Sequence, residues 1–149
     1  MEDRIYRKLT ISDVPLLMKI KKEDPDFNIC EENARQFLSN PMNWIFACIQ
    51  DNRILGLVRG YELSDIHNLG NKLYISAVGV GPQYRREGIG TSIFTKLKET
   101  CKLLGIRKIF LITEKSNVAA NALYKKVGGI SNVNFKDDDD CNIVYNFII

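Results

Sequence analysis

The stretch VGPQYRREGIGT, residues 80–91, decides how this chain folds. A strand-like run ends at Val80, a proline stiffens the exit, and two glycines open a helix. Gly105 is well placed to end that helix in a left-handed conformation. Apolar side chains recur along the helix at the spacing of one buried face, at Ile89, Ile93, Leu97, Thr100/Cys101 and Leu104. The stretch therefore predicts a strand, a glycine-containing turn and a helix over 88–104.

The same stretch has the properties of a phosphate-binding turn. A helix N-terminus presents unpaired backbone N–H groups and a partial positive charge, so a phosphate binds there readily. Gly88 and Gly90 allow a ligand to approach the backbone without a Cβ in the way. Arg85 and Arg86 add donors that suit phosphate oxygens. The alternative is a plain strand-to-helix turn, but such a turn does not need Arg-x-x-Gly-x-Gly at the start of its helix.

Two other phosphate-binding motifs do not fit these residues. A P-loop places Lys and then Ser or Thr after its last glycine, whereas Gly88 is followed by Ile89 and Gly90. The dinucleotide fingerprint G-x-G-x-x-G requires a glycine where this chain has Ile93. A nucleotide-binding protein of either type is therefore disfavoured.

Outward from this stretch, the sequence predicts one mixed α/β domain over residues 1–149. Ser12 and Asp13 are suited to cap the first helix, with Pro15 in its first turn. The almost wholly apolar run KIFLIT at 108–113 is typical of a central strand. The order of elements indicates a single domain. The expected strands are 4–11, 44–49, 53–62, 72–80, 108–113, 130–135 and 142–148, and the expected helices are 14–22, 31–38, 88–104 and 117–127.

Composition fits an ordinary globular protein and excludes several function classes. Of the 149 residues, 45% are apolar and 26% are charged, as in typical globular chains. The net charge of +3 suits a small polyanionic ligand but is too small and dispersed to indicate nucleic acid. Four separated cysteines and one histidine lack zinc-site spacing, so free thiols in the cytoplasm and no metal are expected. No run approaches the ~20 apolar residues of a membrane span.

The segment 117–127 carries a second group of functional candidates. On a helix, Asn117, Asn121 and Tyr124 fall on one stripe, beside an apolar stripe formed by Ala120, Leu123 and Val127. A polar stripe next to a core stripe is typical of a helix that lines a cleft. The alternative for Tyr124 is a half-buried core tyrosine with a hydrated hydroxyl.

Both motifs resemble the GNAT superfamily of N-acetyltransferases. The run V-x-P-x-x-R-x-x-G-I-G-T is similar to the acetyl-CoA motif of that family, and N-x-x-A-x-x-L-Y-x-x-x-G is similar to its second cofactor motif. The resemblance covers nearly the whole chain. It implies an α/β fold with a mixed, mostly antiparallel sheet of six to seven strands flanked by about four helices. It also implies direct transfer of an acetyl group from acetyl-CoA to an amine.

The resemblance assigns roles to individual residues. Main-chain N–H groups of the turn would hold the CoA pyrophosphate, and Val78 and Val80 would bind the pantetheine arm. The N–H of Val80 would also polarise the thioester carbonyl. The hydroxyl of Tyr124 would protonate the departing thiolate. The full set of cofactor-binding candidates is Val78, Val80, Arg85, Arg86, Gly88, Ile89, Gly90, Thr91, Asn117, Asn121, Tyr124 and Lys126.

The general base stays open at the level of sequence. An amine must be neutral to attack, and its pKa lies near ~10. Many relatives carry an acid three positions before the motif valine, where this chain has Ala77. Replacement candidates are Glu62 and Glu114, which end strands, although each also fits a solvated surface group. Ser76 could only orient a water molecule.

The acceptor and the assembly are also open. The run Asp137 to Asp140 fits a solvated turn, or a loop that attracts a cationic acceptor such as a polyamine, an aminoglycoside or a lysine side chain. The acceptor is expected to be a small-molecule or peptide amine, and a homodimer is one alternative for the assembly. A non-catalytic acyl-CoA-binding or sensory module is the competing function. Ala77 favours that alternative, whereas Tyr124 argues against it.

Overall fold

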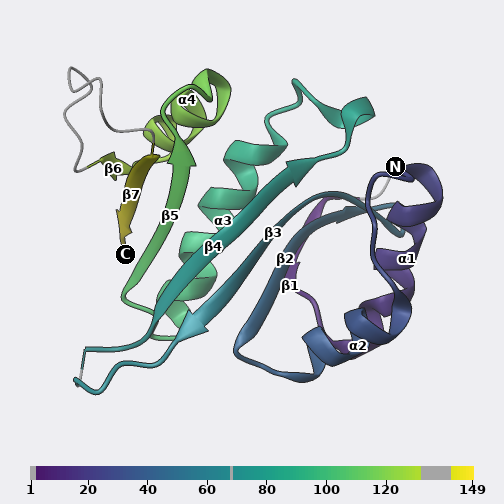
Figure 1. The fold of residues 1–149 in the computed structure, drawn as a ribbon, viewed down its shortest axis with the longest axis horizontal. Coiled ribbons are helices and arrows are strands. Elements are labelled where there is room, and N and C mark those ends of the chain that lie inside the picture. The colour runs from purple at the N-terminus through teal and green to yellow at the C-terminus, as the bar shows by residue number, and fades with distance from the viewer. Residues whose placement is uncertain (1–2, 68, 132–141) are drawn as a thin grey trace.

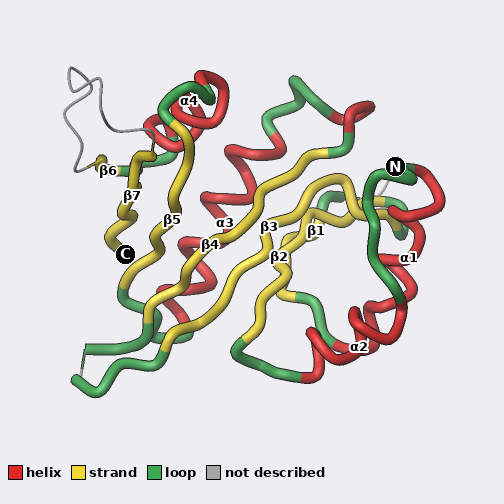
Figure 2. Tube along the Cα trace, viewed as in Figure 1, coloured by secondary structure: helices red, strands yellow, loops and turns green. Residues whose placement is uncertain are grey.

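The computed structural model describes residues 3–67, 69–131 and 142–149, and its strands form one seven-stranded sheet in the order β1-β2-β3-β4-β5-β7-β6. Figures 1 and 2 show the sheet with its helices. The strands are β1 Ile5–Lys8, β2 Asn43–Gln50, β3 Arg53–Leu63, β4 Lys72–Val80, β5 Lys108–Glu114, β6 Ile130–Ser131 and β7 Asn142–Ile148. The helices are α1 Val14–Glu23, α2 Glu31–Ser39, α3 Ile89–Leu103 and α4 Val118–Lys126. This arrangement confirms the predicted mixed α/β sheet.

The helices lie on two sides of the sheet and divide the core in two. α1 and α2 pack on one face, where Val14, Leu17 and Leu38 meet Ala47 and Ile49 of β2. α3 packs on the opposite face, and its buried residues join Trp44, Phe46 and Phe147 from the strands. The predicted buried face of α3 is thus confirmed at Ile89, Ile93, Leu97 and Cys101.

β4 and β5 pair in parallel and then separate. Their register runs from Lys72 opposite Lys108 to Ile75 opposite Leu111 and goes no further. β4 continues to Val80 and stays paired with β3 on its other side. Among the described residues, 76–80 of β4 therefore have no strand partner on the side of β5. Main-chain donors and acceptors along that edge are available to a ligand.

β3 and β4 are held by an antiparallel ladder with one bulge. The register shifts between Arg59, which lies opposite Ala77, and Gly60, which lies opposite Ile75. A bulge places two residues of one strand opposite one of the other and re-aims nearby side chains. Here it lets Val78 and Val80 pack against the α3 core while Ala77 lines the opposite side of the sheet.

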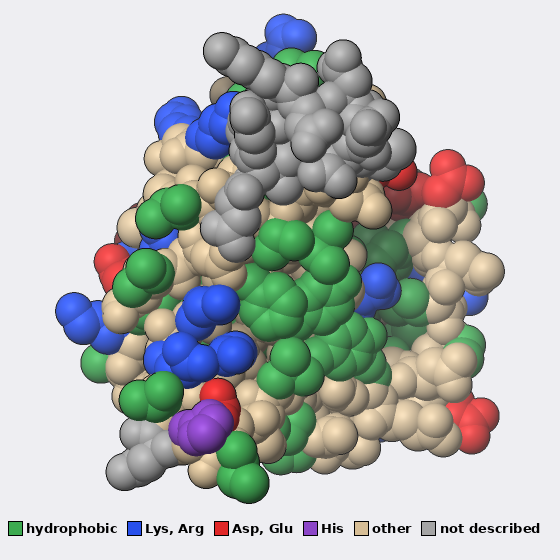
Figure 3. Space-filling view, turned by 60° about the vertical axis from the view of Figure 1, so that its left-hand side comes forward, with side chains coloured by type: hydrophobic (Ala, Val, Ile, Leu, Met, Phe, Trp, Pro, Cys, Tyr) green, Lys and Arg blue, Asp and Glu red, His purple; other side chains and the backbone are tan. Residues whose placement is uncertain are grey.

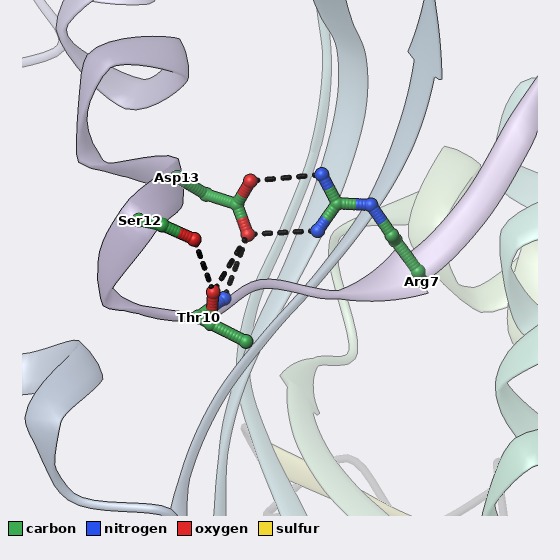
Figure 4. Close-up of polar contacts among 4 residues, drawn as sticks. All are labelled: Arg7, Thr10, Ser12 and Asp13. Carbon is green, nitrogen blue, oxygen red and sulfur yellow. Dashed lines mark hydrogen bonds and ion pairs between the residues drawn. The ribbon is translucent and has the colours of Figure 1, made fainter.

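The start of α1 is fixed by an ion pair rather than by a simple cap. Asp13 is the N-cap residue of α1, yet its carboxylate makes no cap bond to that helix. Its oxygens accept bonds from both terminal nitrogens of Arg7, at 2.7 and 2.8 Å, and from the backbone N–H of Thr10 at 2.7 Å (Figure 4). The expected cap role of Asp13 is therefore corrected: the side chain ties α1 back to β1.

The first expected strand is longer than the strand in the structure. The first strand ends at Lys8 because residues 11–13 form a 3-10 turn that Thr10 and Asp13 close with a capping box. Of the expected strand 130–135, only Ile130–Ser131 lies within the described residues. The acidic run 137–140 lies outside them. Across the residues the structure describes, no helix has both the length and the apolar character needed to cross a membrane.

Candidate active site

The turn between β4 and α3 encloses a hollow of about 210 Å³, here called the α3 hollow. It is open to solvent on one side and lies at the N-terminus of a fifteen-residue helix. Its lining is Val80, Tyr84, Arg85, Arg86, Gly88, Ile89, Gly90, Thr91 and Leu123. The structure thus brings together the whole predicted phosphate-binding turn. Leu123 of α4 also lines the hollow. It was not predicted there, because it is distant from the turn in sequence.

The backbone of this turn contains two left-handed residues. Arg86 has φ +66° and Gly88 has φ +74°, both in the left-handed region. Left-handed residues close together turn successive N–H groups toward one concave side, which binds anions. Gly88 caps α3 with no side-chain bond to the first helical N–H groups, and a Cβ built on it would meet nothing within 4 Å. The space in front of Gly88 is therefore open to a ligand, and a helix N-terminus favours an anionic one.

A second cavity lies on the opposite side of β4, beneath α1 and α2. It holds about 550 Å³, which is in the range of small-molecule sites. We call it the α1–α2 pocket; it is formed by α1, α2, the connection 24–30, β2, β3 and the end of β4. Its walls are mainly apolar, including Leu17, Phe27, Ile29, Phe37 and Leu57.

The two cavities meet at the end of β4. Val80 and Arg85 line both of them, and this is the place where β4 has left β5. A ligand bound in the α3 hollow can therefore continue along the free edge of β4 into the α1–α2 pocket. The divergence of the two parallel strands is confirmed, and their role as the meeting place of cofactor and acceptor stays a prediction.

Tyr124 lies on α4, next in sequence to Leu123 of the α3 hollow, and lines neither cavity. Its side chain is buried, with ring centroids 5.8 Å from Phe94 of α3 and 5.6 Å from Tyr145 of β7. Burial raises the pKa of its phenol above the ordinary 10.0, and the neighbouring Tyr145 raises it further. A phenol with a raised pKa stays protonated at neutral pH, so it can act as a proton donor.

The asparagines of α4 are used within the protein. Asn117 is the N-cap of α4, and its side-chain oxygen accepts the N–H of Ala120 at 3.1 Å. Asn121 is buried and donates to the carbonyls of Asn117 at 2.7 Å and Glu114 at 3.0 Å. Its side-chain oxygen accepts the hydroxyl of Tyr145 at 2.7 Å. Both ends of the Asn121 amide are thus engaged within the protein, and its contact with a cofactor stays a prediction.

The two carboxylates considered as a base lie at different ends of the sheet. Glu62 is opposite Leu73, at the start of β4, roughly 23 Å of extended strand from Val80. It accepts bonds from Trp44 Nε1 at 3.0 Å and Asn71 Nδ2 at 2.8 Å. These contacts and its distance from Val80 make Glu62 the less favourable of the two candidate bases. Glu114 ends β5 on the side where the strands diverge and is exposed.

Other candidates are less informative. Lys126 is an exposed residue in the last turn of α4. No cluster of three or more potential metal ligands was found among the described residues. The α1–α2 pocket also contains a charged residue that the sequence reasoning missed, Arg59 of β3. A single arginine inside the otherwise apolar run ILGLVRG was the available signal.

Comparison with known proteins gives consistent matches. The model of the acetyltransferase (GNAT) family matches residues 12–129. N-alpha-acetyltransferase 30 of Schizosaccharomyces pombe is 29% identical over 96 residues, which are 63% of this chain and 62% of that protein. The chain spans 41% to 62% of the length of the curated relatives that it matches.

Solved structures share the fold at low sequence identity. An aminoglycoside acetyltransferase from an uncultured soil metagenomic sample, crystallised with sisomicin, superposes with a TM-score of 0.72 and 21% identity, covering 84% of this chain and 87% of that one. The ribosomal-protein-S18-alanine N-acetyltransferase of Escherichia coli gives a TM-score of 0.71 and 19% identity, covering 99% and 94%. At such identities the likeness establishes the fold alone.

Proposed function

This chain belongs to the acetyltransferase (GNAT) family, and from that premise we propose that it transfers an acetyl group from acetyl-CoA to an amine. The family implies acetyl-CoA as the cosubstrate. The reaction class is direct transfer, in which cofactor and acceptor are held side by side. Catalysis then comes mainly from positioning and electrostatic stabilisation.

The observation that carries this proposal is the meeting of the two cavities at Val80. The α3 hollow offers backbone N–H groups and two guanidinium groups to a polyanion. The α1–α2 pocket offers an apolar space of acceptor size. Direct transfer needs such an arrangement, with a thioester at the boundary between a phosphate site and an acceptor site.

The chain's own residues would act as follows. The N–H groups of 85–91 hold the pyrophosphate, and the free edge of β4 binds the amide groups of the pantetheine arm. The N–H of Val80 stabilises the negative charge that develops on the carbonyl oxygen. Tyr124 donates its proton to the sulfur atom that leaves. The cosubstrate itself supplies the activated acetyl thioester.

Deprotonation of the acceptor amine is assigned to water rather than to an adjacent carboxylate. Ala77 provides no acid beside the junction, and Glu62 lies at the far end of β4. Glu114 is the remaining acid of the two and would act through a water molecule. A water route predicts turnover that keeps rising with pH as more of the amine becomes neutral.

A non-catalytic acyl-CoA-binding module remains the competing function, because such a module needs the α3 hollow but no acceptor space. The open α1–α2 pocket and the buried phenol of Tyr124 favour the enzyme. The structural relatives act on quite different amines, an aminoglycoside and a ribosomal-protein alanine by their names, so they support an amine acceptor without selecting one.

The test has two stages. Thermal unfolding is measured with acetyl-CoA, CoA and ATP; acetyl-CoA at one hundred times its Kd should stabilise the protein by about 2.7 kcal/mol. Thiol release is then followed with a panel of amino acids, peptides, polyamines and aminoglycosides. Stabilisation without any acceptor-dependent thiol release would favour the binding module. No stabilisation by CoA or acetyl-CoA would overturn both functions.

A further inference from the structure

Arg59 is a cation that lines the α1–α2 pocket. Its Nε donates to Ser76 Oγ at 3.2 Å, and Ser76 Oγ donates to the carbonyl of Arg59 at 3.3 Å. Among residues 3–67, 69–131 and 142–149, no carboxylate lies within ion-pair distance of its guanidinium. A hydroxyl contact to Nε leaves the two terminal nitrogens, which form the flat fork of an arginine, facing other partners.

The position of Arg59 on the sheet places it inside the proposed acceptor site. It lies opposite Ala77 across the β3–β4 ladder, at the bulge, and both residues line the pocket. Directly opposite side chains on a sheet are neighbours at ~5 Å. The methyl group of Ala77, however, has no acceptor for a hydrogen bond from the guanidinium. Val80 is three residues further along β4, about 10 Å of extended strand.

The charges of the described pocket lining are unequal. Two guanidinium groups, Arg59 and Arg85, line it, with a single carboxylate, Asp24. Asp24 accepts a bond from the backbone N–H of Asp26 at 3.1 Å, and Arg85 also faces the α3 hollow. Most of the remaining lining is apolar. A polycationic acceptor would meet a like charge here and few carboxylates, which disfavours its binding.

We propose that the acceptor carries a carboxylate as well as its amine on an apolar body, and that Arg59 binds this carboxylate. The inference rests on the proposed acetyltransferase function and names its substrate class. A guanidinium fork binds a carboxylate through two parallel charge-assisted bonds, and the apolar walls hold the body of the acceptor. The 10 Å between Ala77 and Val80 corresponds to about three residues of extended chain.

Two sources share this chemistry. One is a free apolar amino acid, whose amine and carboxylate lie on the same carbon. The other is the N-terminus of a peptide with an apolar first residue and an acidic residue one or two places later. The peptide spans much of the distance from Arg59 to the junction at Val80. The free amino acid spans little of it, so the long Arg59 side chain would have to reach along β4 toward Val80.

The test uses acceptor pairs that differ only in charge. Methionyl-glutamate amide is compared with methionyl-glutamine amide, and leucine with leucinamide, by thiol release at saturating acetyl-CoA. The peptide pair has nearly equal amine basicity, so it isolates recognition of the carboxylate. A charged hydrogen-bonded pair should favour the carboxylate member roughly 10- to 100-fold in kcat/KM. The pair with the larger kcat/KM identifies the source.

Variants of two arginines on the same strand connect that preference to Arg59. In Arg59→Gln the preference should fall to within about 3-fold of unity, while the KM for acetyl-CoA is unchanged. Arg59→Lys keeps the charge without the fork and should restore part of the preference. The matched control is Arg53→Gln: Arg53 also lies on β3, but it pairs with Glu23 at 3.2 Å and lies outside the pocket. Its variant should keep the full preference.

Failure of this inference is distinguishable from failure of the acetyltransferase function. Equal kcat/KM for both members of each pair, or a preference that survives in Arg59→Gln, overturns the inference and leaves acetyl transfer standing. If no acceptor reacts, thermal unfolding of the CoA-bound protein is measured with each probe. Stabilisation by the carboxylate members that is lost in Arg59→Gln supports the inference, and its absence overturns it.

Discussion

The α3 hollow and the α1–α2 pocket share Val80 and Arg85, but they are built in opposite ways. The α3 hollow is formed almost entirely by consecutive residues, and its donors are backbone N–H groups turned inward by Arg86 and Gly88. The α1–α2 pocket collects side chains from two helices, three strands and a connection. One cavity is defined by local conformation, the other by tertiary packing.

Because of this difference, the two cavities tolerate different substitutions. A site made of backbone donors accepts many side chains but no added Cβ at the point of closest approach. A site made of side chains changes its selectivity with each substitution, while the backbone stays the same. The cosubstrate, which is common to the family, is therefore expected in the α3 hollow. The acceptor, which varies, is expected in the α1–α2 pocket.

The largest expected effect on turnover comes from removing the proposed proton donor. Tyr124→Phe keeps the ring contacts of the core but removes the proton donor, so turnover should fall about 10²- to 10⁴-fold, with acetyl-CoA binding little altered. The control is Tyr145→Phe, which removes a neighbouring buried hydroxyl that is bonded to Asn121. It should lose about 1 kcal/mol of stability and retain turnover. Full turnover in Tyr124→Phe, with chemistry rate-limiting, would place the proton donor elsewhere.

A second substitution tests the backbone-built cavity alone. Gly88→Ala puts a methyl group where the phosphate is expected, and should abolish most of the ~2.7 kcal/mol stabilisation by CoA at one hundred times the wild-type Kd. Gly105→Ala is a closely matched control, because Gly105 has φ +77° and a Cβ there also meets nothing within 4 Å. Both variants should lose ~1–2 kcal/mol to backbone strain. CoA shifts that are equal in the two variants would remove the phosphate from this turn.

A smaller effect is expected from a substitution at the start of α1, which forms part of the wall of the α1–α2 pocket. Asp13→Asn breaks the pair with Arg7 that fixes the start of α1, and should cost about 1–3 kcal/mol of unfolding free energy in urea. Because α1 lines only this pocket, the acceptor KM should rise while the acetyl-CoA KM stays constant. If both constants rise together, the two cavities are not independent.

Asp13 also leads to a prediction about how the stability of the fold depends on pH. The guanidinium of Arg7 lowers the pKa of Asp13 below its usual range, more than burial raises it. A carboxyl group with a lowered pKa stabilises the fold fully above its unfolded pKa of ~3.9, and loses this contribution as pH falls through the lowered value. Below pH ~4, stability should therefore fall less steeply in Asp13→Asn than in the wild type. Parallel acid curves would show that the pair contributes nothing to this dependence.

The smallest effect is expected at Arg86. Its guanidinium can contact phosphate but is exposed, and its φ of +66° is unfavourable for a residue with a side chain. Arg86→Gly should stabilise the free protein by up to about 1 kcal/mol and weaken CoA only a few-fold. A loss of CoA binding as large as that in Gly88→Ala would mean that side chains, rather than the backbone, form this site.

The division between the cavities also explains what could be predicted from sequence. The phosphate turn, the strand Lys72–Val80 and the helix after it follow from glycine positions and apolar periodicity, which are local signals. The family resemblance added Tyr124 and the second motif. Arg59 was not predicted as a site residue. Its position in the α1–α2 pocket depends on the β3–β4 register and on α1 and α2, which are distant in sequence.

The internal contacts of two candidate residues could not be predicted from sequence. Asn121, within α4, and Glu62, near the end of β3, are polar groups that local patterns cannot separate from site residues. Their partners, Tyr145 for one and Trp44 and Asn71 for the other, come from distant parts of the chain. An acidic or amide side chain is structural when tertiary contacts satisfy it, and only the fold reveals those contacts.

The separation of β4 from β5 has a consequence for the handling of this protein. Residues 76–80 form a free strand edge in the interior of a seven-stranded sheet. Unpaired edges are templates on which other extended chains add and aggregate. The pantetheine arm would occupy this edge and act as the missing strand, so the unliganded protein is the aggregation-prone species. Solubility on storage would then depend on CoA as well as on the chain itself.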